Sequence, residues 1–460
     1  MRPILIILLL ATIASCKVGP KYERSKLAES KKAYATSTSG AISDTSSLAK
    51  WFDIYHDAAL QELIKSSLEN NLDMKLTVAR IEEARSNAGI VKANLLPTIG
   101  YKLGAGTTDS KTNPQQAMVA IPNTYYTGAL TLNWEIDLFG KIRNSKSSAV
   151  NVYMQQEELK KNLNVILVAE VADNYFLLRD LDNRLEIAER TLKSRKESLR
   201  INSERFDKGY NAEIDKLQAQ MQLSAVEATI PNIKRQIVSV ENGLNLLMGR
   251  SSGAITRGKK NSEQDLPLTI PSGLPSQLLE RRPDIKAAEY SLQAQYDRIG
   301  VAQANRFPTL SLTAALGMAS PQLTTLIGAN SPYGSVAGGL LGPVFAFNQN
   351  KKRVDVERQR AMQSQAVYEK TVLQAFLEVD NSLANNMYLT QEYDARKVQV
   401  MAGKKALDLS QQRYNFGYTS YLEVLVQENS LFDAEIQESI TQRQKYSALV
   451  NLYKALGGGW

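Results

Sequence analysis

The sequence predicts a mainly α-helical protein that carries transmembrane β-strands and consists of two tandem repeats. Two stretches, residues 141–208 and 344–402, contain neither Gly nor Pro over 68 and 59 residues. Segments in which apolar residues alternate with other residues lie near them, and matching motifs recur in the same order along the chain. A helix over residues 141–208 would be about 100 Å long, so other helices must cover its apolar stripe.

The chain begins with a short leader. Residues 1–15 combine Arg2 with an apolar stretch that is too short to span a bilayer, which predicts a signal peptide. Small residues precede Cys16, the only cysteine, as in a bacterial lipoprotein processing box. We therefore expect lipidation at Cys16 and a lipidated N-terminal tail over residues 16–50, because two or more acyl chains anchor a protein stably. Lys17 favours the outer membrane; the alternative is an ordinary signal peptide with an incidental cysteine.

The tandem repeat follows from motifs that match in order. Residues 93–99 match residues 304–310 at a shift of 211, and residues 205–210 match residues 413–418 at a shift of 208. Such self-similarity is typical of a duplicated structural unit. The predicted parts after the tail are a first repeat over 51–250, a linker over 251–275 and a second repeat over 276–460.

Each repeat is expected to hold three helical stretches. The first ends before Pro97 or Pro308, since Pro cannot continue a helix. The long stretch follows, and then a return helix after a Gly turn. Pro231 is expected to kink the first return helix. The predicted helices are 57–94, 141–208 and 211–248 in the first repeat, and 283–305, 344–416 and 419–456 in the second.

The predicted strands alternate with period two. Residues 126–138 and 309–318 place apolar side chains on one face, residues 99–105 do so more weakly, and the Gly-rich residues 333–347 do not reveal their outward face. Alternation over about 10 to 12 residues is typical of a transmembrane β-barrel strand. A soluble helical protein with a small β-sandwich is the alternative. The polar loops 109–123 and 320–332 are expected to face the outside of the cell.

Four strands cannot close a barrel. An open sheet edge in lipid leaves backbone donors and acceptors unsatisfied, and the smallest single-chain barrels have about eight strands. Several copies of the chain must therefore share one barrel, and three copies would supply twelve strands.

The residue inventory argues against an enzyme. With His56 as its only histidine and Cys16 as its only cysteine, the chain cannot form a Cys/His metal cluster or an internal disulfide. A catalytic triad would depend on His56 alone, and no carboxylate pair lies in a Gly-rich or loop context. The net charge of +8 is spread along helices, so nucleic-acid binding is not expected. We expect no catalytic residue, metal or cofactor.

Five motifs carry a family resemblance. They are Cys16 with residues 18–22 (VGPKY), residues 94–98 (NLLPT), 134–143 (WEIDLFGKIR), 278–285 (LLERRPDI) and 456–460 (LGGGW). Together they resemble the outer membrane factor family, the TolC-type channels, and more narrowly the lipoprotein branch of RND efflux channels. The resemblance covers essentially the whole chain after the leader.

The resemblance implies a homotrimer with a 12-stranded β-barrel in the outer membrane and a periplasmic α-helical barrel. It also implies an equatorial belt, built from residues 249–275 with the segments near Trp51 and the C-terminus. It implies passive export of drugs or other small molecules that an inner-membrane RND transporter and a periplasmic adaptor (membrane fusion) protein hand over. One alternative is the exit duct of a type I protein secretion system. Another is a lipid-anchored helical scaffold without a pore.

The resemblance also implies a gate and an adaptor-docking site at the periplasmic tip. The gate would use Asp215 and Glu423, which match across the repeats, while Val426 stands where a second acid would be expected. The alternative is that these two acids only stabilise the positively polarised N-termini of the return helices. The adaptor-docking tip would consist of Lys208, Gly209, Tyr210, Asn415, Phe416, Gly417 and Tyr418.

Overall fold

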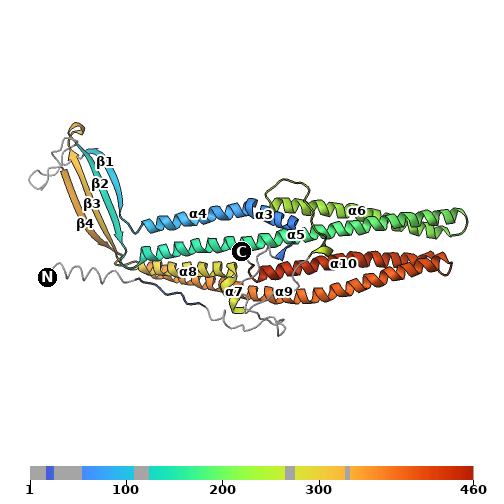
Figure 1. The fold of residues 1–460 in the computed structure, drawn as a ribbon. Coiled ribbons are helices and arrows are strands. Elements are labelled where there is room, and N and C mark those ends of the chain that lie inside the picture. The colour runs from blue at the N-terminus through green and yellow to red at the C-terminus, as the bar shows by residue number, and fades with distance from the viewer. Residues whose placement is uncertain (1–16, 25–53, 108–123, 265–274, 327–331, 459–460) are drawn as a thin grey trace, which may run out of the picture. The chain divides into compact units, whose positions relative to one another are not determined.

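The computed structural model describes residues 17–24, 54–107, 124–264, 275–326 and 332–458 (Figure 1). The chain forms two compact units. The strand unit comprises Met1–Ser25, Arg80–Glu157 and Ala287–Glu369, and the helical unit comprises Lys26–Ala79, Glu158–Lys286 and Lys370–Trp460. The main elements are α3 (Ala58–Asn70), α4 (Leu72–Ala93), β1 (Thr98–Thr107), β2 (Thr124–Ile136), α5 (Lys141–Asp207), α6 (Glu213–Leu247), α7 (Pro275–Arg281), α8 (Pro283–Ala304), β3 (Thr309–Ser320), β4 (Pro332–Leu341), α9 (Gln349–Asn415) and α10 (Tyr421–Ala455). Two short 3-10 turns are η2 (Asn261–Glu263) and η3 (Leu323–Thr325).

The order of elements repeats within the chain. A helix, two strands, a long helix and a return helix occur first as α4, β1, β2, α5 and α6, and again as α8, β3, β4, α9 and α10. The paired helices have equal lengths, with 22 residues in α4 and α8, 67 in α5 and α9, and 35 in α6 and α10. The predicted tandem-repeat architecture is confirmed.

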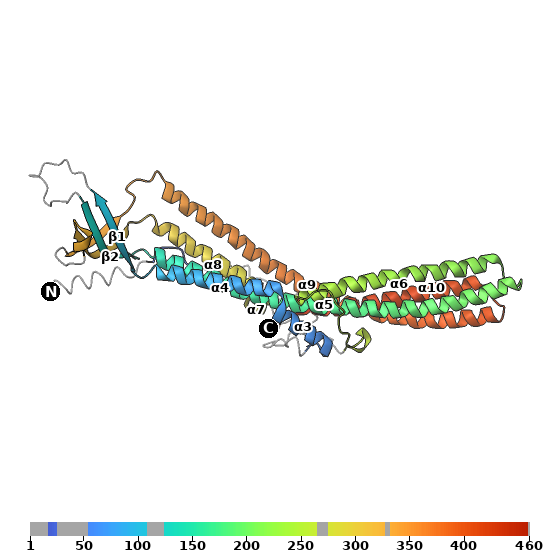
Figure 2. The same cartoon turned by 90° about the horizontal axis from the view of Figure 1, so that it is seen from above.

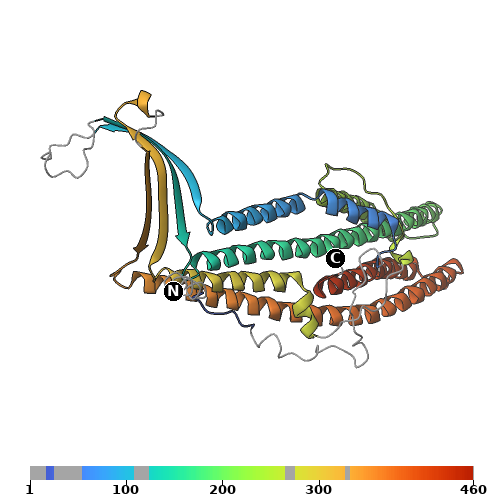
Figure 3. The same cartoon turned by 60° about the vertical axis from the view of Figure 1, so that its left-hand side comes forward.

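The strand unit holds one antiparallel sheet with the order β1-β2-β3-β4 (Figure 3). Its register sets apolar residues opposite one another, as in Ile99 with Leu132, Leu130 with Leu316, and Leu310 with Leu340. Directly opposed residues share a face, so one face of the sheet is apolar across all four strands.

The register also assigns the outward face of β4. Val336 lies opposite Ala314, which belongs to the face of Leu310, so Val336 and Leu340 continue the apolar face. The expected strand over 333–347 is too long, because β4 ends at Leu341. The loop residues 108–123 and 327–331 lie outside the described part of the chain.

The helical unit has its core around the middle of α5. Tyr175, Phe176 and Leu178 of α5 are fully buried, together with Leu60 of α3 and Leu244 of α6. Figures 1 and 2 both show α5 beside α6 and α9 beside α10. None of the helices in the described part of the chain has the length and apolar character of a membrane-crossing helix.

The expected single helix over 57–94 is wrong. Asn71 separates α3 from α4, with backbone angles φ −56° and ψ 134° that leave the helical region. Its side chain accepts a 3.0 Å hydrogen bond from Met74 N and donates a 2.9 Å bond to Leu247 O. Asn is favoured at a helix start because its side chain satisfies a free backbone N–H group, and here it caps α4.

The other helix predictions agree with the structure to within a few residues. The exception is the start of α9 at Gln349, which follows two residues with positive φ, Phe347 and Asn348. α6 runs without interruption through Pro231, and the kink expected there stays a prediction.

Candidate functional site

Residues 17–24, which we call the N-terminal strap, lie against the start of α5 in the strand unit. Val18 N donates to Phe139 O at 3.2 Å, and Asn144 Nδ2 donates to Val18 O at 2.8 Å. Asn144 is 2% exposed, so this attachment is part of the packed interior. Cys16, the predicted lipidation site, lies outside the described residues and directly precedes Lys17. These bonds therefore hold the chain at Val18, two residues after the predicted acylation site.

A second attachment joins the strap to α8. Arg24 donates to the two carboxylate oxygens of Glu289 at 2.9 and 2.7 Å, and the Tyr22 hydroxyl donates to the same carboxylate at 3.0 Å. The rings of Tyr22 and Tyr296 pack edge to face, with their centroids 5.7 Å apart. Hydrogen bonding to Glu289 raises the pKa of Arg24, while burial and then Glu289 raise the pKa of Tyr22. Two-pronged charge-assisted pairs of this kind fix geometry as well as adding stability.

The predicted tip turns have the same geometry in both repeats. Gly209 has φ +74° and Gly417 has φ +78°, a left-handed conformation that ends a helix at low cost only for glycine. In the first turn, Gly209 N donates to Phe206 O and Tyr210 N to Arg205 O, each at 2.8 Å. The large side chains at the two turns are about three-quarters exposed, namely Tyr210, Phe416 and Tyr418.

The two predicted gate acids differ in their contacts. Asp215 and Glu423 both lie in the first turn of a return helix, α6 and α10. Glu423 forms a salt bridge with Arg413, with Nη1 3.3 Å from the carboxylate, and accepts a hydrogen bond from the Thr419 hydroxyl. Within the described chain the Asp215 side chain has no such partner. Val426 is 49% exposed, so its position presents an apolar side chain rather than a second acid.

A buried carboxylate near the tip was not predicted. Glu428 of α10 is 7% exposed, and among the described residues neither of its carboxylate oxygens has a hydrogen-bond partner. Burial raises the pKa of Glu428, and Arg195 opposes this shift. Arg195 is itself 4% exposed and donates to Gln222 O and Asn429 Oδ1 at 2.7 Å each.

The sequence holds a signal for this site. Arg195 lies between Leu192 and Leu199 on the apolar stripe of α5, and Glu428 follows Leu425 on α10 at the same helical spacing. A charged residue that interrupts an apolar stripe marks a buried charge.

The structure offers no candidate metal centre in the residues that it describes, since none of them form a group of three or more His, Cys, Asp or Glu side chains suited to a metal ion. The single histidine, His56, is exposed and directly precedes the buried Asp57.

Comparisons with known proteins place the chain in a family. A model of the family described as outer membrane efflux protein matches residues 63–250 and 274–458. The solvent efflux pump outer membrane protein SrpC of Pseudomonas putida is 33% identical over 415 residues, covering 90% of this chain and 88% of SrpC. The outer membrane protein OprJ of Pseudomonas aeruginosa is 31% identical over 461 residues, covering 99% of this chain and 95% of OprJ.

A solved structure agrees with these relatives. The open state of the MtrE outer membrane channel of Neisseria gonorrhoeae matches with a TM-score of 0.87 and 30% identity, covering 96% of this chain and 98% of MtrE. The predicted channel fold class and the predicted function in outer membrane efflux are confirmed by these likenesses. The chain belongs to the outer membrane efflux protein family.

Proposed function

We propose that three copies of the chain form one channel with a shared 12-stranded β-barrel in the outer membrane. The observation that carries the proposal is the sheet of a single chain, in which β1 and β4 are edge strands and one face is apolar throughout. Edge strands in lipid need partners for their backbone groups. Pairing β4 of one copy with β1 of the next satisfies both edges.

The proposed membrane attachment uses the leader and the strap. Cleavage after residue 15 and acylation of Cys16 place the lipid next to Lys17 and Val18, which the strand unit holds. The acyl chains enter the inner leaflet of the outer membrane beside the barrel, and the long helices extend into the periplasm. The lipidated tail comprises residues 16–50 and the equatorial linker residues 251–275; of these, residues 16, 25–50 and 265–274 lie outside the described part of the chain.

The proposed transport role is passive. An inner-membrane RND transporter and a periplasmic adaptor deliver small molecules, and the trimer conducts them outward without a chemical step or a cofactor. The exposed aromatic residues Tyr210, Phe416 and Tyr418 suit adaptor docking, because aromatic side chains supply large contact areas in interfaces. Asp215 and Glu423 at the same tip form the gate.

The experiment tests assembly and conduction together. The full-length protein is expressed with its leader, extracted from outer membranes in mild detergent, and run unheated and heated on denaturing gels. We expect a heat-sensitive trimer and step-like channel currents in planar bilayers. Mass spectrometry of the mature N-terminus is expected to find an acylated Cys16. A monomer in crosslinked native membranes, or a trimer without conductance, would overturn the shared channel; an unmodified Cys16 would remove only the lipid anchor.

A further inference from the structure

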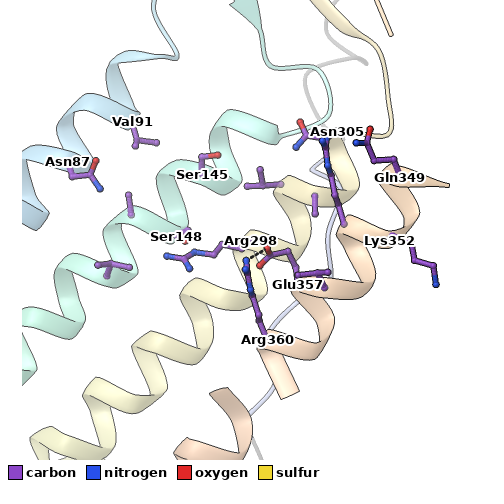
Figure 4. A pocket seen from close by; sticks show the side chains of 16 residues that line it. Asn87, Val91, Ser145, Ser148, Arg298, Asn305, Gln349, Lys352, Glu357 and Arg360 are labelled. Atoms are coloured by element: carbon purple, nitrogen blue, oxygen red, sulfur yellow. Dashed lines mark hydrogen bonds and ion pairs between the residues drawn. The ribbon is translucent and has the colours of Figure 1, made fainter. Parts of the chain in front are cut away.

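Four helices of the strand unit lie in a row. Contacts within this unit order them as α4, α5, α8 and α9. The contacts that join neighbours are Arg85 over the Tyr153 ring at 6.0 Å, Ser148 Oγ donating to Ala294 O at 3.0 Å, and Gln295 Nε2 donating to Glu357 Oε2 at 2.5 Å. A cavity of about 780 Å³ is lined by side chains from all four helices (Figure 4). Since the outer members α4 and α9 both reach it, the row is curved and the cavity lies on its concave face.

The cavity combines an apolar wall with positive charge. Its apolar lining consists of Val91, Ala149, Val152, Val301, Ala302 and Val356. Its charged lining is Arg298, Lys352, Arg353, Arg360 and Glu357, so four cations face one carboxylate. The volume falls in the range of small-molecule sites, and the lining suits a molecule with an apolar body and an anionic group.

Two of the four cations carry charge that no carboxylate balances. Arg360 pairs with Glu357 at 2.6 Å, and Lys352 lies 3.7 Å from Asp355. Within the described residues, Arg298 and Arg353 make only long hydrogen bonds of 3.5 Å to amide oxygens, those of Gln295 and Asn350. Their guanidinium groups are therefore available to an anionic ligand.

The opposite face of α8 carries the strap. At about 100° per residue, Glu289 and Tyr296, which the strap contacts, lie about 160° to 180° around α8 from Arg298. The strap is thus on the convex face of the row and the cavity on the concave face. A strap that leads to a membrane anchor must run outside a closed channel. When copies of the row close into a ring, the cavity faces the lumen.

We propose that this cavity is a lumen-facing binding site for amphiphilic anions, with Arg298 and Arg353 as the residues that recognise the anionic group. This inference rests on the proposed channel. In a trimer the three cavities form a collar with six unbalanced guanidinium groups. Molecules with an apolar ring or chain and a carboxylate or sulfonate bind there in transit, and small inorganic anions are concentrated there.

The test measures block of single-channel currents in planar bilayers by 1-naphthalenesulfonate, with 1-naphthylmethylammonium as the cationic comparison. In Arg298→Gln/Arg353→Gln we expect the half-blocking concentration of the sulfonate to rise about fivefold, as for the loss of two modest charge contacts. Arg298→Lys/Arg353→Lys keeps the charge and is expected to stay within about twofold of the wild type. The matched control, Lys351→Gln/Arg358→Gln, removes two charges from the opposite face of α9 and should leave block unchanged.

The outcomes separate the two claims. If the wild type conducts and the sulfonate blocks the cavity variant and the wild type equally, the anion site is overturned and the channel is not. If block by the sulfonate weakens equally in the cavity variant and in the control variant, the anion site is also overturned, because the weaker block would then follow from net charge alone. A wild-type trimer without current overturns the proposed function itself.

Discussion

The Tyr175 hydroxyl donates a 2.7 Å hydrogen bond to the Asp57 carboxylate in the interior of the helical unit, where Asp57 is 2% exposed. The same carboxylate accepts from Gln264 Nε2 at 2.8 Å and from Lys259 N at 2.9 Å. One side chain thereby joins the start of α3, the middle of α5 and the segment that follows α6.

We expect Asp57→Ala to lower the free energy of unfolding by about 3 kcal/mol, because several buried donors lose a charged acceptor at once. Gln264→Ala removes one donor to this carboxylate and is expected to cost about 1 kcal/mol. Thermal unfolding of the detergent-solubilised protein measures both variants. Equal melting temperatures for the two would contradict the central role of Asp57.

The pH dependence of the same contact follows from its pKa. Burial raises the pKa of Asp57, but the hydrogen bonds from Gln264, Tyr175 and two backbone N–H groups outweigh it and hold the pKa below its ordinary value. Because the pKa of Asp57 is lower in the folded state than in the unfolded state, the ionised carboxylate stabilises the fold fully at a pH above the unfolded pKa of about 3.9. This stabilisation is lost as the pH falls through the folded-state pKa. We expect Asp57→Ala to have a flatter stability profile than the wild type below about pH 4.

The stability contribution of Glu428 changes with pH in the opposite direction. Burial raises its pKa, so the folded state binds a proton more tightly than the unfolded state and stability falls as the pH rises through the unfolded and then the folded value. The charged groups that line its cavities include Arg190, Arg195, Lys404 and Glu435. We expect Glu428→Gln to raise the free energy of unfolding at pH 7 by about 1 to 3 kcal/mol, because the amide has a similar shape and no charge that burial must strip of water.

The measurement for Glu428 is thermal unfolding between pH 4 and 8, with the exposed Glu227→Gln on α6 as the matched control. The advantage of Glu428→Gln over the wild type should shrink toward acid pH, where the wild-type carboxyl is protonated. A variant that is less stable than the wild type at pH 7 would mean that the carboxylate has a stabilising partner.

Much of the fold was predictable because its signals are local. The absence of Gly and Pro over residues 141–208 fixed the extent of α5 to within one residue, and alternation located β2 and β3. The outward face of β4 was not predictable, because Gly338 and Gly339 carry no side chain to mark a face, and only the pairing with β3 assigns it. The break at Asn71 was missed because apolar spacing continues across it.

The candidate site was less predictable than the fold. The tip turns follow from Gly209 and Gly417, whose positions between helical stretches indicate helix ends. The positions of Arg195 and Glu428 on apolar stripes indicate that both are buried, but they do not indicate which residues surround them. The attachment of Arg24 to Glu289 joins residues more than 200 positions apart, and no local pattern specifies such a contact. The roles of Cys16, Asp215 and Glu423 stay predictions.

The strap makes a prediction about Glu289, which is 7% exposed and accepts from both Tyr22 and Arg24. Glu289→Ala is expected to destabilise the protein by about 2 kcal/mol, since a charge-assisted pair and a buried acceptor are lost together. Trypsin should then cut after Lys21 or Arg24 faster than in the wild type. The exposed Glu83→Ala on α4 serves as the control, and equal cleavage rates in both variants would show that the strap is held by other contacts.

The two faces of β2 make a prediction about membrane assembly. Leu132 belongs to the apolar face that includes Ile99 and Ala314, whereas its neighbour Thr131 points to the other face. We expect Leu132→Arg to cost about 2 to 4 kcal/mol and to reduce heat-sensitive trimer in outer membranes. Thr131→Arg should assemble normally. Loss of trimer in both variants, or in Thr131→Arg alone, would contradict the assignment of the lipid face.

The two predicted gate acids at the tip differ in their ion-pair contacts. Glu423 is held by Arg413, whereas Asp215 has no ion-pair partner in the described chain, so Glu423→Ala frees a guanidinium group and Asp215→Ala frees none. If both acids form the gate, Asp215→Ala/Glu423→Ala should raise conductance and lower cation preference in planar bilayers, because rings of acids attract cations in a narrow pore. Glu213→Ala, an exposed acid in the same turn of α6 as Asp215, is the control. If the double variant and this control give the same conductance and selectivity as the wild type, the acids serve only the helix N-termini, where a negative charge opposes the positive end of the helix dipole.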